Sequence, residues 1–334
     1  MRYPKFPTKA LLIIIILINI SSWVRYAQTN QHNPDPDHTN DAKAKYVIII
    51  TIDGLRPDAI TEGNVPHIQS LIKKGSCSLE AKTVIPARTL PAHTSLLTGL
   101  TPERHGMKIN FWVPFMKHVD IETIFSVAKE KGLKTAMFVG KDKLRYLARP
   151  NTVDHFESTG EAPGSNDTIA SRFSSYMKTE RPELVLIHFP EPDLTGHQMG
   201  WMSEDYIKAL EQVDRAIKVI LESLDEAGIY EHTLLIITSD HGGQGKNHIG
   251  SDSEVITIPW IAVGPGVKKG YRINGNVNIY DTAATVLVAL GIKPPPKWEG
   301  KPIKEVFIAP TQPLGKTRCK RGVSILLNMI GAKL

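Results

Sequence analysis

The chain has 334 residues, of which 41% are hydrophobic and 22% charged, so it can bury a substantial core in one large domain or two small ones. The formal charge is +6, but four basic residues and no acid lie within residues 1–27, which leaves +2 for the remainder and gives no support for nucleic-acid binding. Cys77 and Cys319 permit one disulfide but form no CxxC metal motif.

The N-terminal segment has the pattern of an export signal. Basic residues precede the apolar run 10–20 (ALLIIIILINI), which suits a signal peptide better than a membrane span of ~20 residues. We predict that residues 1–27 direct export to the periplasm or the extracellular space and are cleaved after Ala27, although Arg25 fits that cut poorly. The alternative is an uncleaved anchor through residues 10–20. No stable membrane partner is expected otherwise.

Residues 28–44 are polar with two prolines, which predicts a flexible leader before a folded domain at 45–311. Near-continuous apolar runs then predict strands at the following positions: 45–53, 134–140, 182–189, 232–240 and 259–264. Apolar residues three and four apart predict helices at 65–75, 121–132 and 204–228, each ending in glycine. Strands buried on both faces are typical of parallel sheets. The alternation predicts a three-layer α/β/α sandwich with a mostly parallel sheet.

The basic and apolar tail at 312–334 predicts a docked helix, with membrane contact as the alternative.

Three of the predicted strands lead into an aspartate at their carboxyl ends. Asp53 and Asp240 each end a strand, and Asp193 follows another. Ligands of open parallel sheets bind at this edge, although any single aspartate there is equally consistent with a turn residue.

Histidines accompany two of these acids. His197 follows Asp193 by four positions, and His241 and His248 follow Asp240. Carboxylates and imidazoles together are the donors that zinc and similar divalent ions prefer, so the sequence predicts a metal centre. The glycines within residues 242–245 would let the backbone pass close to that centre.

A threonine at a predicted helix start is the candidate nucleophile. Thr89 precedes Leu90 and Pro91, and residues 91–99 have the pattern of the first turns of a helix. A hydroxyl there would lie near the positive helix end, which favours an anion. The structural alternative is an N-cap threonine.

Six sequence blocks together resemble the alkaline phosphatase superfamily, most closely its type I phosphodiesterase and nucleotide pyrophosphatase branch. The blocks are TIDGLRPD, PARTLPAHTSLLTGLTPERHG, PDLTGH, TSDHGGQGKNHIG, IPWIAVGPGV and YDTAATVLVALGI. The likeness runs from about Tyr46 to Ile303. It implies an alkaline phosphatase-like fold and a phosphoric ester hydrolase that acts on a small phosphate ester or nucleotide.

The resemblance also implies two divalent metal ions, expected to be zinc. One ion would be held by Asp193, His197 and His248, and the other by Asp53, Asp240, His241 and the Thr89 oxygen. Thr89 would attack phosphorus, and water would then hydrolyse the phosphothreonine. Asn110 falls where the family places an amide that binds a phosphoryl oxygen. The other conspicuous histidines are expected to have structural roles: His67, His93, His105 and His188.

The preferred ester depends on what surrounds the phosphoryl group. An extra cation favours monoesters or phosphonates, whereas an apolar rim favours diesters. Residues 140–147 (GKDKLRYL) place Lys141 and Lys143 at a strand end and resemble the lysine pair with which phosphonoacetate hydrolases bind an anionic substrate. A solvated loop is the alternative for these lysines. Residues 151–183 are expected to hold loops that select the substrate.

We expect phosphodiester or pyrophosphate bonds to be the target, with phosphomonoesters or phosphonates as the alternative. A sulfatase would need a C/S-x-P-x-R motif, which PARTLPA lacks. The alternative of a different class is a non-catalytic protein that binds metal or phosphate. A broken ligand set would mark such a protein, and every position of the family pattern is filled.

Overall fold

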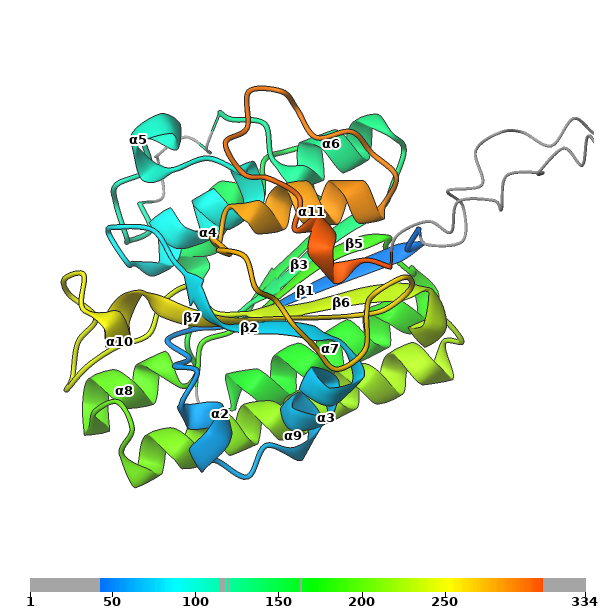
Figure 1. Cartoon of the computed structure of the whole chain (residues 1–334). Coiled ribbons are helices and arrows are strands. Elements are labelled where there is room, and N and C mark those ends of the chain that lie inside the picture. The colour runs from blue at the N-terminus through cyan, green and yellow to red at the C-terminus, as the bar shows by residue number, and fades with distance from the viewer. Residues whose placement is uncertain (1–42, 114–117, 119, 163, 309–334) are drawn as a thin grey trace, which may run out of the picture. The chain divides into compact units, whose positions relative to one another are not determined.

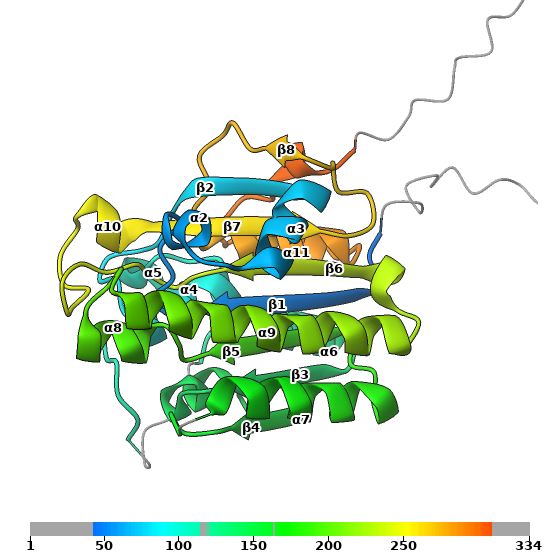
Figure 2. The same cartoon turned by 90° about the horizontal axis from the view of Figure 1, so that it is seen from below.

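An eight-stranded sheet forms the centre of the computed structural model, which describes residues 43–113, 118, 120–162 and 164–308. The strand order is β4-β3-β5-β1-β6-β7-β2-β8, as Figure 2 shows from below. The strands are β1 Tyr46–Ile52, β2 Ser76–Lys82, β3 Thr135–Val139, β4 His155–Ser158, β5 Leu184–Phe189, β6 Thr233–Thr238, β7 Thr257–Val263 and β8 Tyr271–Arg272. The five strands from β4 to β6 in this order are parallel, and β7 is antiparallel to both β6 and β2.

Helices cover both faces of the sheet (Figure 1). On one face lie α4 Thr89–Thr98, α5 Pro102–His105, α6 Ile124–Glu130 and α11 Asp281–Ala289. On the other lie α2 Ala59–Glu62, α3 Pro66–Lys74, α7 Ser165–Thr179, α8 Asp193–Met199 and α9 Glu204–Glu226. The short elements are α10 Ser253–Ile256 and the 3₁₀ turns η2 Asp142–Leu147, η3 Tyr230–His232 and η4 Lys304–Val306. This is the predicted three-layer sandwich.

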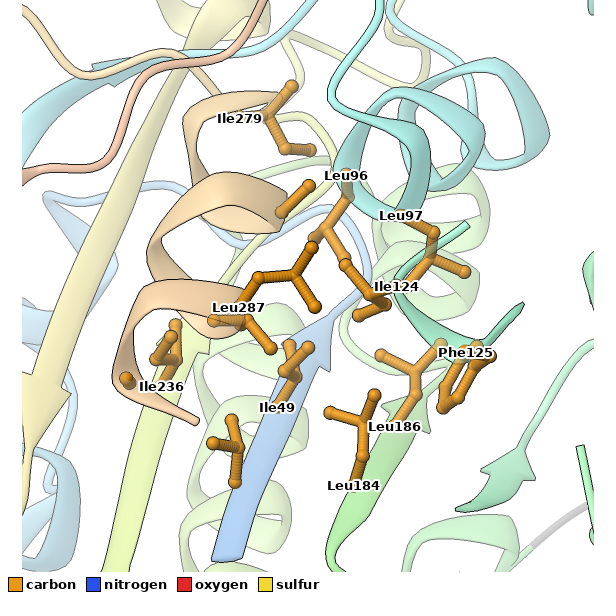
Figure 3. Close-up of a cluster of buried hydrophobic side chains, with 14 of the residues drawn as sticks. Ile49, Leu96, Leu97, Ile124, Phe125, Leu184, Leu186, Ile236, Ile279 and Leu287 are labelled. Carbon is orange, nitrogen blue, oxygen red and sulfur yellow. The ribbon is translucent and has the colours of Figure 1, made fainter. Parts of the chain in front are cut away.

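The core lies in two layers because successive side chains of a strand point to opposite faces. In β1, Val47 and Ile49 pack with the α4, α6 and α11 layer, whereas Ile48 and Ile50 pack with the α3, α7 and α9 layer. Figure 3 shows part of the first layer, where Ile49 meets Leu287 and its neighbours. Every residue of β1 is buried, which explains why the sequence shows an unbroken apolar run.

All five predicted strands and all three predicted long helices are present. The run at 259–264 differs from the expectation in direction, because β7 is antiparallel to β6. Helices cover it on both faces like its parallel neighbours, so its apolar pattern carries no information about direction. The more polar strands β2, β4 and β8 were not predicted, since none of them shows a continuous apolar run.

Residues 151–183 contribute β4 and α7, and α7 packs beside α9 (Figure 2). Most of the segment expected to select substrate is therefore regular structure. The predicted signal, most of the leader, the tail at 312–334 and Cys319 lie outside the described residues. Within the described part of the chain, no helix is both long enough and apolar enough to span a bilayer.

Candidate metal centre

Four neighbouring parallel strands end at the same edge of the sheet and gather the charged residues of the site. Lys141 follows β3, Asp193 follows β5, Asp53 follows β1 and Asp240 follows β6. The backbone N–H of Asp193 donates to the carbonyl of Asp53 at 3.0 Å, which ties two of these strand ends together. The topology thus brings residues that are far apart in sequence into one pocket.

The predicted protein ligands form two groups in which the donor atoms lie within 4.8 Å of one another. One group is Asp53, Asp240 and His241, and the other is Asp193, His197 and His248. The groups adjoin, because the His241 and His248 rings stack with centroids 3.8 Å apart. The six expected ligands therefore share one pocket.

Solvent access differs between the two groups. The Asp53, Asp240 and His241 group is fully buried. In the other group the side chain of His197 is 43% exposed and that of His248 is 12% exposed. The site is therefore closest to solvent on the side of His197.

All three ligand histidines are held by the same kind of hydrogen bond. His241 Nδ1 lies 2.8 Å from the carbonyl oxygen of Gly242. His197 Nδ1 lies 3.0 Å from that of Lys246, and His248 Nδ1 lies 2.7 Å from that of Ala87. A carbonyl oxygen only accepts, so each Nδ1 carries the proton and each Nε2 keeps its lone pair. This arrangement is typical of metal-binding histidines.

Four buried polar atoms at the centre of the pocket have no hydrogen-bond partner among the residues that the structure describes. They are Asp53 Oδ1, Asp193 Oδ1, Asp240 Oδ2 and His241 Nε2. His241 Nε2 lies 3.4 Å from Asp53 Oδ1 and 3.5 Å from Asp240 Oδ2. Buried groups left unpaired in this way are costly, and divalent cations would satisfy all four at once. The residues present therefore fit a pair of metal ions.

Thr89 is the first residue of α4 and is buried beside these acids. Its Oγ1 donates to Asp53 Oδ2 at 3.4 Å, and its backbone N–H meets no acceptor among the described residues. Asn110 Oδ1 accepts from Leu90 N at 2.9 Å, which fixes the Asn110 amide next to the helix start. The hydroxyl and an amide donor thus lie together at the positive end of a ten-residue helix.

Lys141 is buried, so the alternative of a solvated loop is wrong for this lysine. It is 2% exposed, and its Nζ lies 2.8 Å from Asp53 Oδ2 and 2.6 Å from Asp193 Oδ2. Lys143 is half-buried in η2. Contact of either lysine with substrate stays a prediction.

Close backbone packing explains two of the glycines. An added Cβ at Gly243 would lie 2.2 Å from the Trp201 ring, so only glycine lets the loop between His241 and His248 cross that ring. Gly54 has a φ of +72°, and its added Cβ would lie 3.0 Å from the Asp193 Cα.

The charges of the pocket shift several pKa values. Burial raises the pKa of Asp53, but Lys141, His188 and His241 outweigh it and hold that pKa well below its usual range. Burial and the adjacent Asp53 raise the pKa of Asp240. Burial, with a smaller effect from His241, lowers the pKa of His248 to about 4, so His248 is neutral at pH 7 and can act as a ligand.

Two histidines that we expected to be structural support the site directly. His188 Nε2 donates to Asp53 Oδ2 at 3.0 Å, since its Nδ1 accepts from Gly140 N. His93 bonds to the carbonyl of Thr89 and to the Thr51 hydroxyl. His188 also carried a signal in the sequence, because it is the one polar residue of the strand LVLIHF.

The remaining two lie elsewhere. His67 pairs with Asp214 at 2.7 Å, and His105 lies 2.9 Å from Ser95 Oγ. Both therefore fit the expected structural roles.

A three-layer sandwich with paired carboxylate and histidine groups at the strand ends defines the alkaline phosphatase class of fold and site. The family model for type I phosphodiesterase / nucleotide pyrophosphatase matches residues 47–250. The chain belongs to that family, whose homologues are phosphoric ester hydrolases.

Relatives include human ectonucleotide pyrophosphatase/phosphodiesterase family member 1, which is 29% identical over 60% of this chain and 24% of its own length. Bis(5'-adenosyl)-triphosphatase ENPP4 of Pongo abelii is 25% identical over 59% of this chain and 47% of its own. The chain spans about a quarter to a half of the length of these two relatives.

Solved structures share the fold at low sequence identity. Murine ectonucleotide pyrophosphatase / phosphodiesterase 5, an inactive threonine-to-alanine form in complex with AMP, matches with a TM-score of 0.68 at 16% identity over 79% of this chain and all of its own. A 2-O GAG sulfatase matches with a TM-score of 0.64 at 16% identity over 78% of this chain and 73% of its own. At this identity the likeness concerns the fold alone.

Proposed function

We propose that this chain hydrolyses phosphodiester or pyrophosphate bonds at a two-metal site, with Thr89 as the nucleophile. The observation that carries the proposal is the position of the Thr89 hydroxyl. It lies at the start of α4 and donates to Asp53, which belongs to one ligand group and adjoins the other group. Of the curated relatives, the triphosphatase and the pyrophosphatase/phosphodiesterase names also point to phosphoanhydride and phosphodiester substrates.

The chain's own residues suit an in-line displacement. The Thr89 oxygen would form a bond to phosphorus while the bond from phosphorus to the leaving oxygen breaks and that oxygen keeps the electron pair. Water would then cleave the phosphothreonine and restore the hydroxyl. Two divalent ions would supply the positive charge that stabilises the reacting oxygens. Zinc suits the mixed carboxylate and imidazole ligands.

Donors for the phosphoryl oxygens lie next to the nucleophile. The Oδ1 atom of the Asn110 amide accepts from Leu90 N, while its nitrogen has no hydrogen-bond partner among the described residues. Together with the Thr89 N–H it could bind the equatorial oxygens, which gain charge in the transition state. Both donors are in place before substrate binds.

Exposed apolar side chains near the site residues in sequence favour a diester over a monoester. Ile249 is 75% exposed and adjoins His248, and Phe111 is 59% exposed and adjoins Asn110. Met199 and Ile85, each 53% exposed, lie two residues after His197 and four before Thr89. A diester carries a second organic group that such apolar side chains would contact, whereas a monoester presents a more highly charged phosphoryl group.

The test is hydrolysis of bis(p-nitrophenyl) phosphate, p-nitrophenyl phosphate and phosphonoacetate by the purified chain, with and without a chelator. We expect the diester to have the highest kcat/KM and the chelator to abolish its hydrolysis. A higher kcat/KM for p-nitrophenyl phosphate or phosphonoacetate would favour the monoesterase or phosphonatase alternative. Hydrolysis of none of them, with metal bound, would favour a binding protein.

A further inference from the structure

Lys141 makes the same contact with both metal-ligand groups. Its Nζ is bonded to Asp53 Oδ2 at 2.8 Å and to Asp193 Oδ2 at 2.6 Å, and these aspartates belong to different groups. The lysine lies just after β3, next to β5 in the sheet, so its side chain reaches the pocket from the strand ends. We propose that Lys141 is a positioning residue that links the two metal positions by holding one carboxylate of each.

The hydrogen bonds of the two carboxylates explain how Lys141 would act. In each carboxylate the Oδ2 atom is bonded to Lys141, while the Oδ1 atom is buried without a partner. The free Asp53 Oδ1 lies 3.4 Å from His241 Nε2, and the free Asp193 Oδ1 lies 3.4 Å from His197 Nε2. Holding Oδ2 fixes the rotation of the carboxylate, so each Oδ1 stays directed at the histidine of its own group.

Charge favours a lysine at this position. Three aspartates of the pocket are buried within one small volume, where like charges repel. Among the described residues, Lys141 is the only lysine or arginine within 4.0 Å of any of them. A compact ammonium can lie between two carboxylates, whereas the planar fork of arginine suits a single one. Lys141 thus acts as a fixed cation built into the pocket.

The inference rests on the proposed two-metal function, and it predicts a joint effect on both ions. In Lys141→Met the side chain keeps nearly the same length but loses its charge and its hydrogen bonds. We expect the affinity for both ions to fall by about 10–100-fold, as is typical when a partner of a ligating group is removed. The measurement is competition between the folded protein and a chromogenic chelator for Zn²⁺, with the visible spectrum of the Co²⁺-loaded protein as a second readout.

Lys134→Met is the matched control, because Lys134 precedes the same strand at its other end and forms an exposed pair with Glu180. We expect the control to bind both ions like the wild type. Equal or tighter binding by Lys141→Met would overturn the role of Lys141, and so would a loss confined to one ion. If the wild type itself held no ions, the proposed function would fail instead.

A crystal structure of the zinc-loaded wild type tests the same role without a variant, should Lys141→Met fail to fold. We expect Asp53 and Asp193 each to bind metal through one oxygen while Lys141 Nζ stays within hydrogen-bond distance of the other. A lysine displaced from either carboxylate would overturn the inference.

Discussion

Thr89 shows how much depends on the surroundings of one hydroxyl group. In the sequence, a threonine before Leu-Pro fits a helix cap better than a nucleophile. Within the described part of the chain its side chain caps no backbone N–H, and its only side-chain hydrogen bond goes to Asp53. The Thr89 hydroxyl thus lies against an acid of the predicted metal centre, where a nucleophile would act.

Thr89→Ala should lower kcat for the diester by at least about a thousandfold, because the attacking oxygen is lost. Both ions should remain, since Asp53, Asp240 and His241 keep three ligands of that group in place without the Thr89 oxygen. Stopped assays for kcat and mass spectrometry for metal content would measure the two effects. Thr98→Ala is the control, because Thr98 is a buried threonine of the same helix and bonds only to the Thr94 carbonyl. Activity in Thr89→Ala comparable with that control would remove Thr89 from the mechanism.

His105 should make stability depend on pH. Burial lowers its pKa from 6.5 to about 4, against smaller opposing effects of Glu103 and Glu299. Because the pKa is lower in the folded state, the stabilisation is complete above pH 6.5 and is lost as the pH falls toward 4. Urea denaturation should therefore show a shallower decline in the free energy of unfolding over that range for His105→Asn than for the wild type. His232→Asn, at an exposed histidine, should keep the wild-type decline. Equal slopes for the wild type and His105→Asn would contradict the prediction.

The loop between β6 and α10 is the element that completes the pocket. It carries His241, which belongs to one ligand group, and His248, which belongs to the other. The carbonyl oxygen of Gly245 in this loop accepts a hydrogen bond from Trp201 N at 2.7 Å. Trp201 in turn donates through Nε1 to Gly54 O, which lies next to Asp53. Glycine at 243 allows this packing, so the position of the histidines depends on the absence of a side chain there.

Gly243→Ala should displace this loop and lower kcat/KM by about a hundredfold, the effect of moving catalytic groups by roughly 1 Å. Metal analysis should show loss of the ion held by Asp193, His197 and His248. In the same loop, Gly245→Ala is the control, since an added Cβ there meets open space and costs only the strain of a φ of +56°. The prediction is wrong if the two variants retain equal amounts of metal.

Over the whole molecule, the sheet order makes the pocket. Strands β3, β5, β1 and β6 come from separate parts of the chain but lie side by side, so their last residues converge. At that edge each of the three aspartates has one buried oxygen without a hydrogen-bond partner among the described residues, which lowers the stability of the metal-free protein. Export directed by residues 1–27 stays a prediction, and an uncleaved anchor through residues 10–20 is its alternative.

Removing the metal should therefore destabilise the entire protein. At a free Zn²⁺ concentration about 100-fold above Kd, each ion should add about 2.7 kcal/mol, which corresponds to a rise in Tm of roughly 5–10 °C for a domain of this size. Differential scanning calorimetry of chelated and reloaded protein would measure it. Asp240→Asn, which weakens one group, should show a smaller rise than the wild type. An unchanged Tm on reloading would argue against ions at this site.

The sequence alone determined the fold class, the main strands and the identity of the six candidate ligands. The pattern of apolar residues along the chain indicates which segments are buried strands and helices. The six motif blocks identify the candidate ligands by their order in the sequence, which does not depend on packing. The direction of β7, the edge strands, the support of Asp53 by His188 and the contact of Lys141 with two aspartates were decided only by the tertiary structure. Each depends on contacts between residues distant in sequence, because side-chain hydrogen bonds across a sheet leave no periodic pattern along the chain.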